Sequence, residues 1–171
     1  MTEPAGQNDT SPPRSSADAE RVFLVVVDDT EEMHAALMFA CQRARRTSGR
    51  VALLRVIEPV EFQHWGSVAR LMRSEAREEA EQLLHRLSED VHTWSGKVPV
   101  LHVREGMAQE EILALIDEDR SICILVLGAD IGPGGPGPLV SQFTSKLVAR
   151  LHVPMTIVPG NMTDEQIRQM A

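Results

Sequence analysis

The chain contains no tyrosine, few aromatic residues, two cysteines and almost no lysine. Aromatic residues make up 4% of the 171 residues, which leaves little material for a surface on which nucleic-acid bases could stack. Lysine occurs only at Lys97 and Lys146, and the formal net charge is −8. Because affinity for DNA depends on clustered cationic side chains that contact phosphates, these absences argue against a nucleic-acid partner.

Long apolar runs and a disulfide framework are missing as well. No stretch approaches the ~18–20 consecutive apolar residues of a membrane span, so we expect no membrane association. The first residues lack the apolar segment of a secretory signal. Cys41 and Cys123 lie among apolar residues, which is typical of reduced, structural thiols. These features together predict a cytoplasmic protein.

The sequence also lacks the usual marks of catalysis and of metal binding. Its six histidines are scattered, without the short spacing to further ligands that a zinc site needs, so we expect no metal. It contains neither a Walker loop nor a G-x-S-x-G elbow. A small α/β enzyme with Asp28 as its general base is an alternative, but the sequence supplies no partner nucleophile or second acid. We therefore expect no catalytic residues.

What the sequence does contain is a regular alternation of short apolar runs and amphipathic segments. Five runs rich in β-branched residues predict buried strands; they cover 21–27, 51–57, 98–103, 121–127 and 154–158. Helical spacing of apolar residues follows each of the first four runs. We expect Asp29 or Thr30 to cap the first helix, a connector over 59–66, a long helix over 67–94 and one regular helix over 139–151. Pro99 indicates that the third strand lies at a sheet edge.

This order predicts an α/β fold, with an open, doubly wound, five-stranded parallel sheet and helices on both faces. Residues 1–20, rich in Pro, Ser and Asp, are expected to form a disordered tail, and residues 21–160 the domain. Residues 161–171 read as a C-terminal tail with a short helix capped by Thr163 or Asp164. Ligands of such sheets bind at the carboxyl ends of the strands, which here means Asp28 and the loop 128–138.

Five segments occur in an order and spacing that resemble the universal stress protein family over about residues 21–159. They are VVVDDTEE, LLRVIEP, HVREGMAQEEILALI, ILVLGAD and HVPMTIVP. The resemblance implies a Rossmann-like fold of the adenine nucleotide alpha hydrolase type and a role in the stress response. It further implies a homodimer that forms through the last strand, Pro154 to Pro159. Many members of this family bind ATP, and others do not.

The ATP signature of the family is altered in this chain. ATP-binding members carry a glycine, two residues, a second glycine, nine residues, then a third glycine followed by Ser or Thr. This register falls on Gly128, Ile131, Ser141 and Gln142, so only the first glycine is present. Ile131 adds bulk where the family backbone contacts the phosphates. Prolines in the same loop lack the N–H groups with which a loop binds phosphate; they are Pro133, Pro136 and Pro138.

The resemblance also assigns candidate ligand contacts elsewhere. Asp28 matches an acidic residue that faces the nucleotide, although a helix cap explains it equally well. Val56 or Ile57 would line the adenine, with a core role as the alternative. Gly132 supplies backbone freedom in the loop. The candidate nucleotide site therefore consists of Asp28, Val56, Gly128, Ile131, Gly132, Ser141 and Gln142, and ATP is the one cofactor considered.

Two functions follow from these observations. The first is a non-enzymatic binding or signalling module of the stress response, whose nucleotide signature is degraded. The alternative is a universal stress protein that binds ATP or another adenine nucleotide and hydrolyses ATP slowly.

Overall fold

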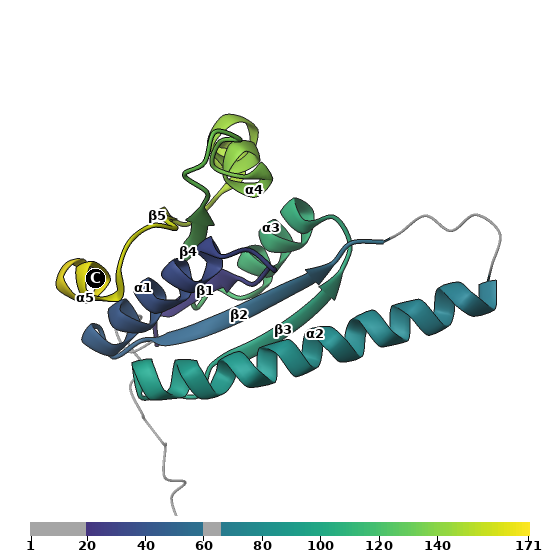
Figure 1. Ribbon diagram of the computed structural model, residues 1–171, viewed down its shortest axis with the longest axis horizontal. Helices are drawn as coiled ribbons and strands as arrows, with labels where there is room; N and C mark the ends of the chain where they lie inside the picture. Colours follow the sequence, from purple (N-terminus) through teal and green to yellow (C-terminus); the bar gives the residue numbers. More distant parts are fainter. Residues whose placement is uncertain (1–19, 60–65) are drawn as a thin grey trace, which may run out of the picture.

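The computed structural model describes residues 20–59 and 66–171 (Figure 1). Its five strands form one sheet in the order β3-β2-β1-β4-β5, and every neighbouring pair is parallel. The strands are β1 (Val22–Val26), β2 (Arg50–Ile57), β3 (Val100–Glu105), β4 (Ile122–Ala129) and β5 (Met155–Pro159). The predicted α/β fold is thereby confirmed. The expected disordered tail, apart from Glu20, and most of the expected connector lie outside the described residues.

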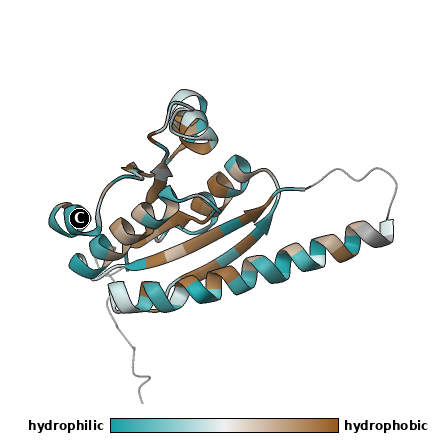
Figure 2. Cartoon of the chain, in the orientation of Figure 1, coloured by the Kyte–Doolittle hydropathy of each residue, from teal (hydrophilic) through white to brown (hydrophobic). Residues whose placement is uncertain are grey.

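Helices cover both faces of this sheet, which makes it doubly wound. One face packs against α1 (Glu32–Arg46), α2 (Gly66–Ser95) and α5 (Asp164–Met170). The other packs against α3 (Ala108–Glu118) and α4 (Pro138–Gln142). Figure 2 shows the consequence as apolar strands enclosed by helices whose outer faces are hydrophilic. Strand β1 lies in the middle, and all five of its residues are buried, which explains its continuous apolar sequence.

Both edge strands occupy the positions expected from the sequence. β3 forms one edge, and Pro99 directly precedes it, where a missing N–H leaves the sheet ladder intact. β5 forms the other edge and pairs only with β4 among the described strands. Its outer side is therefore open to a further strand.

The cap expected for the first helix is wrong. The helix begins at Glu32, and the side chain of Glu31 at the N-cap position makes no capping hydrogen bond. Thr30 is held instead by Asp28, whose Oδ1 accepts hydrogen bonds from the backbone N–H of Thr30, at 3.1 Å, and from its hydroxyl. This Asx turn ends just before the helix, so it directs the chain into α1 without capping it.

The regular helix expected over 139–151 is also wrong in its form. Only α4 is α-helical; a π-helical turn, η1 (Phe143–Leu147), and a 3-10 turn, η2 (Val148–Arg150), follow it. The hydroxyl of Thr144 donates to the carbonyl oxygen of Val140 at 2.7 Å, and such back-bonding competes with the helical ladder. Phe143 is fully buried at the start of the π turn and anchors the segment against the sheet.

The last residues form the short helix α5, and Thr163 caps it. The Thr163 hydroxyl accepts from the N–H of Gln166, whose side chain accepts in return from the N–H of Thr163. Ile167 and Ala171 are fully buried in the core cluster that contains α1. The end of the chain is therefore packed into the domain.

Helix α2 is the longest element and extends past the ends of the strands that it covers (Figure 1). Its C-terminal half buries Leu84 and Val91 completely, whereas Leu71 and Met72 near its start are exposed. Packing of this helix against the domain therefore comes from its second half.

In the described ranges no helix combines the length and apolar character needed to cross a bilayer.

We predict that Leu84→Ala lowers the free energy of unfolding by about 2–5 kcal/mol, because it leaves a cavity between α2 and the sheet. Leu71→Ala on the same helix is the matched control. Its side chain is 60% exposed, so a change within about 0.5 kcal/mol is expected. Urea titrations followed by circular dichroism measure both; equal losses would contradict this account of α2.

Candidate functional site

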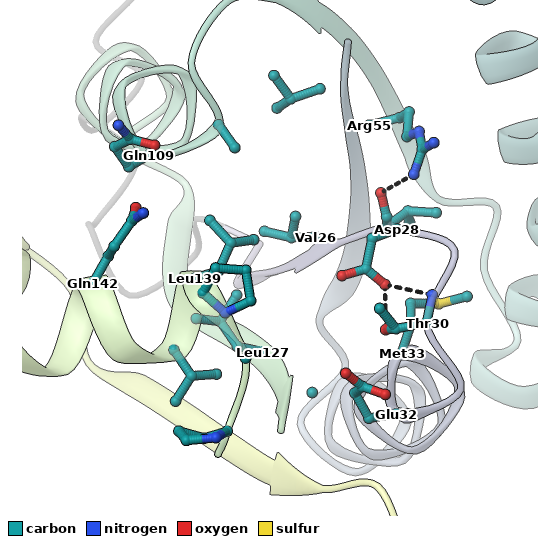
Figure 3. Close-up of a pocket in the computed structure, with 18 of the residues that line it drawn as sticks. Val26, Asp28, Thr30, Glu32, Met33, Arg55, Gln109, Leu127, Leu139 and Gln142 are labelled. Carbon is teal, nitrogen blue, oxygen red and sulfur yellow. Dashed lines mark hydrogen bonds between the residues drawn. The ribbon is translucent and has the colours of Figure 1, made fainter. Parts of the chain in front are cut away.

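A pocket of about 540 Å³ opens at the carboxyl ends of β1 and β4, between these strands and the starts of α1, α3 and α4 (Figure 3). The chain leaves β1 toward β2 and β3 on one side, whereas β4 and β5 lie on the other side. The pocket therefore occupies the switch point of the sheet, where open α/β sheets bind their ligands.

The walls of the pocket are largely apolar. Side chains at the ends of three strands contribute, together with the first turns of two helices; they are Val26, Val56, Leu127, Met33, Leu139 and Val140. Val26, Leu127 and Val140 are buried in the core beneath. A concave apolar surface with a few polar groups is typical of sites for small organic ligands.

Asp28 lies at the rim directly after β1 and has two roles at once. One carboxylate oxygen closes the Asx turn with Thr30, and Figure 3 shows the other directed toward the pocket. The helix cap that the sequence left open for Asp28 is therefore not formed, and the oxygen outside the turn with Thr30 is available for a ligand contact. A carboxylate in this position can accept hydrogen bonds from hydroxyl or amino groups of a ligand.

The charges around the pocket are mainly negative. Among the described residues that line it, the acids are Asp28, Glu32 and Glu58, and the single cation is Arg55. The guanidinium of Arg55 donates to the backbone oxygen of Val27 at 3.2 Å and to the carboxylate of Asp29 at 2.7 Å. Its charge is therefore shared with Asp29, and the pocket presents a surface that disfavours polyanions.

The loop after β4 offers few amide donors to an anion. The stretch of it that lines the pocket includes Pro136, Gly137 and Pro138, of which only Gly137 has an N–H group. Further back, the N–H of Gly132 donates to Oδ1 of Asp130 at 2.8 Å, and the N–H of Gly135 donates to the carbonyl oxygen of Gly132. Much of the donor capacity of the loop is therefore used within the loop itself.

The structure brings four of the seven candidate residues together. Asp28, Val56, Gly128 and Gln142 line the pocket. Ile131, Gly132 and Ser141 do not, and Ile131 is 60% exposed. The bulk of Ile131 therefore points away from the site, and the sequence argument that it obstructs a phosphate does not apply.

Gly128 has a packing role that requires no ligand. A Cβ atom on this residue would lie 2.5 Å from the carbonyl oxygen of Glu32, in the first turn of α1. Glycine is thus needed here for the close approach of helix and strand. The one glycine of the ATP signature that the chain retains is explained by the fold alone.

Sequence reasoning missed several residues of the pocket, among them Arg55, Glu58 and Gln109. Arg55 and Glu58 follow from the carboxyl end of β2, which reaches the same edge of the sheet as β1. Gln109 lies in the first turn of α3, opposite Gln142 on α4 (Figure 3). No spacing in the sequence marks Gln109, because its role depends on the packing of α3 beside α4.

Other reactive groups lie away from the pocket. Burial raises the pKa of the Cys41 thiol to about 12, and burial also raises the pKa of Cys123, so both thiols stay protonated at neutral pH. In the ranges 20–59 and 66–171 no three His, Cys, Asp or Glu side chains are grouped as metal ligands.

Comparison with known proteins identifies the family. A sequence model described as the universal stress protein family matches residues 20–159. The chain belongs to this family. No curated protein matches the sequence. The fold is that of universal stress proteins: UspA of Lactobacillus plantarum has a TM-score of 0.68 at 19% identity, with 81% of this chain and 97% of that chain covered.

Two further universal stress protein structures contain nucleotides. One, described as a complex with cAMP, has a TM-score of 0.59 at 14% identity, and the match covers 82% of this chain and 97% of that chain. The other, from Arabidopsis thaliana with AMP bound, has a TM-score of 0.57 at 18% identity, and the match covers 85% of this chain and 94% of that chain. These similarities establish the fold of this universal stress protein.

We predict that Gly128→Ala destabilises this universal stress protein by about 1–3 kcal/mol, because the new methyl group meets the backbone of Glu32. Gly134→Ala, in the loop that follows β4, is the control, since a Cβ there meets nothing within 4 Å. Urea unfolding of both variants without ligand measures the difference. A Gly128→Ala protein as stable as the control would show that this glycine has no packing role.

Proposed function

We propose that this protein is a non-enzymatic module of the stress response that binds a small adenosine-containing ligand. The observation that carries the proposal is the apolar pocket at the switch point, with the free oxygen of Asp28 at its rim. Its volume of about 540 Å³ lies within the ~300–1,000 Å³ typical of small-molecule sites. The apolar walls suit a purine ring, and Asp28 suits the hydroxyl groups of a ribose.

The related structures support an adenine ligand. Two members of the family with the same fold hold AMP or cAMP. Both ligands combine adenine and ribose with a single phosphate. The acidic surroundings of the pocket in this chain, and its proline-rich loop, favour a ligand of low charge over ATP.

The residues of the pocket support binding without turnover. None of the described residues that line it is a serine, cysteine, lysine or histidine. Asp28, the one candidate base, already accepts two hydrogen bonds from Thr30. The single hydroxyl among the described lining residues belongs to Thr30, and it is committed to the turn before α1 through its hydrogen bond to Asp28. We place this activity in the cytoplasm, where the free thiols of the buried Cys41 and the half-buried Cys123 stay reduced.

We predict that calorimetric titration with adenosine and AMP gives binding heat and that Asp28→Ala weakens the affinity at least about tenfold, through loss of a charged hydrogen-bond acceptor. Asp130→Ala is the matched control, because Asp130 makes the same kind of turn, to the N–H of Gly132, but lies outside the pocket. Mass spectrometry of molecules released by denaturation tests for a copurified ligand. The proposal fails if adenosine, AMP and ATP all give no heat; ATP turnover would contradict the non-enzymatic part.

The second part of the proposal concerns the partner, which is another copy of this chain at the outer edge of β5. The N–H of Leu125 donates to the carbonyl oxygen of Pro154 at 3.0 Å, which sets the alternation along the strand. The backbone groups of Met155 and Ile157 consequently face the open edge. An apolar edge strand of this kind is normally paired or covered.

We predict a dimer in size-exclusion chromatography with light scattering at micromolar concentration, and a monomer for Ile157→Lys, because a charge on the edge opposes strand pairing. Val98→Lys is the control at the opposite edge of the sheet, where an exposed valine precedes β3. The side chains of Ile157 and Val98 are 37% and 59% exposed, so both proteins should fold. A monomeric wild-type protein, or a dimer that survives Ile157→Lys, contradicts this interface.

A further inference from the structure

The inner end of the pocket contains a polar group that the protein leaves without a partner. Oε1 of Gln142 is buried, and no group among the described residues donates a hydrogen bond to it. Gln142 is nevertheless one of the residues that line the pocket, so its buried acceptor lies close to the ligand space. A buried acceptor without a partner costs free energy, which a ligand donor would recover.

A second carboxamide lies at the same end. Gln109, in the first turn of α3, also lines the pocket, and Figure 3 shows the side chain of Gln142 extending from α4 toward Gln109. Arg150, in the turn η2 that follows α4 and η1, makes two hydrogen bonds of 2.9 Å to the carboxylate of Glu110, the neighbour of Gln109 on α3. Paired carboxamides offer both donors and acceptors but no charge.

Gln142 occupies the position at which the ATP-binding members of the family have the hydroxyl residue of their signature. Among the described residues that line the pocket, no cationic side chain comes from the segments that carry this pair. The single guanidinium that lines the pocket belongs to Arg55, and it is bound to Asp29 and to the backbone of Val27. A phosphate at this end would lie in an acidic pocket without a counter-charge, which is energetically unfavourable.

We propose that the Gln109 and Gln142 carboxamides bind a neutral polar group, so that the pocket selects a nucleoside over its phosphorylated forms. This inference rests on the proposed adenosine-binding function and specifies the ligand within it. Adenosine has hydrogen-bond donors on both its ribose and its purine, which can serve Asp28 at one end of the pocket and the glutamines at the other. It brings no charge into the acidic pocket.

The test compares adenosine, AMP and ATP by calorimetric titration against the wild-type protein and two variants. We expect the wild-type protein to bind adenosine at least about tenfold more tightly than AMP or ATP. Gln142→Leu removes the acceptor while retaining bulk, and should weaken adenosine binding about three- to tenfold, as expected for one hydrogen bond. Ser141→Ala, one residue earlier and outside the pocket, is the control and should bind like the wild-type protein.

A third variant tests the charge argument in the opposite direction. Gln142→Lys places a cation at this end and should shift the preference toward AMP, with adenosine binding weakened. Thermal unfolding without ligand establishes that each variant is folded before it is titrated.

The outcomes separate the two proposals. If AMP or ATP binds the wild-type protein more tightly than adenosine, or if Gln142→Leu binds adenosine unchanged, the nucleoside preference is overturned while the adenosine-binding function stands. If none of the three compounds binds, the proposed function is overturned and the preference falls with it.

Discussion

The close seating of α1 on the sheet is the constraint on which the site depends. The first turn of this helix contacts two glycines, and a Cβ atom on Gly128 or Gly160 would lie within about 2.6 Å of Glu32 atoms. Gly128 approaches the backbone carbonyl of Glu32 and Gly160 approaches its Cβ atom, so a larger residue at either position would force a shift. Because α1 begins so close to the ends of β4 and β5, the short connection from β1 must turn sharply. Asp28 and Thr30 make that turn, and this places a carboxylate at the rim of the pocket.

The same constraint changes the meaning of the family signature. In a phosphate-binding loop, glycine serves the approach of the ligand. In this chain Gly128 allows the close approach of a helix, and the residues at the other signature positions make different contacts. Ser141 lies outside the pocket, where its carbonyl oxygen accepts a hydrogen bond from the hydroxyl of Ser145. Gln142 alone of the substituted residues faces the pocket.

The sequence was sufficient for the sheet because burial leaves a direct mark on it. Val22–Val26 are buried on both faces and read as an unbroken apolar run, and the order of such runs with helical segments leaves few topologies. The mixed helix after α4 was beyond the sequence because its pattern of apolar spacing is also that of a regular helix. The difference arises from Thr144 and Ser145, whose hydroxyls bond back to the preceding turn. The direction of a side chain could not be predicted from the sequence either. Ile131 was expected at the phosphate site, but it is exposed and does not line the pocket.

The polar groups of the site were the hardest to foresee, since each depends on two elements that meet only in the fold. Asp28 could be assigned either to a helix cap or to a ligand, but it forms the turn before α1 with one oxygen and directs the other toward the pocket. Gln142 looked like the loss of a hydroxyl, but with Gln109 beside it the substitution becomes a gain of a neutral donor and acceptor pair. A binding site can lose its attraction for phosphate without losing its shape, because the apolar walls belong to the core and the charge selectivity belongs to a few rim residues. In this protein Val26 and Leu127 form part of the apolar wall, and Asp28, Arg55 and the two glutamines supply polar groups to the pocket.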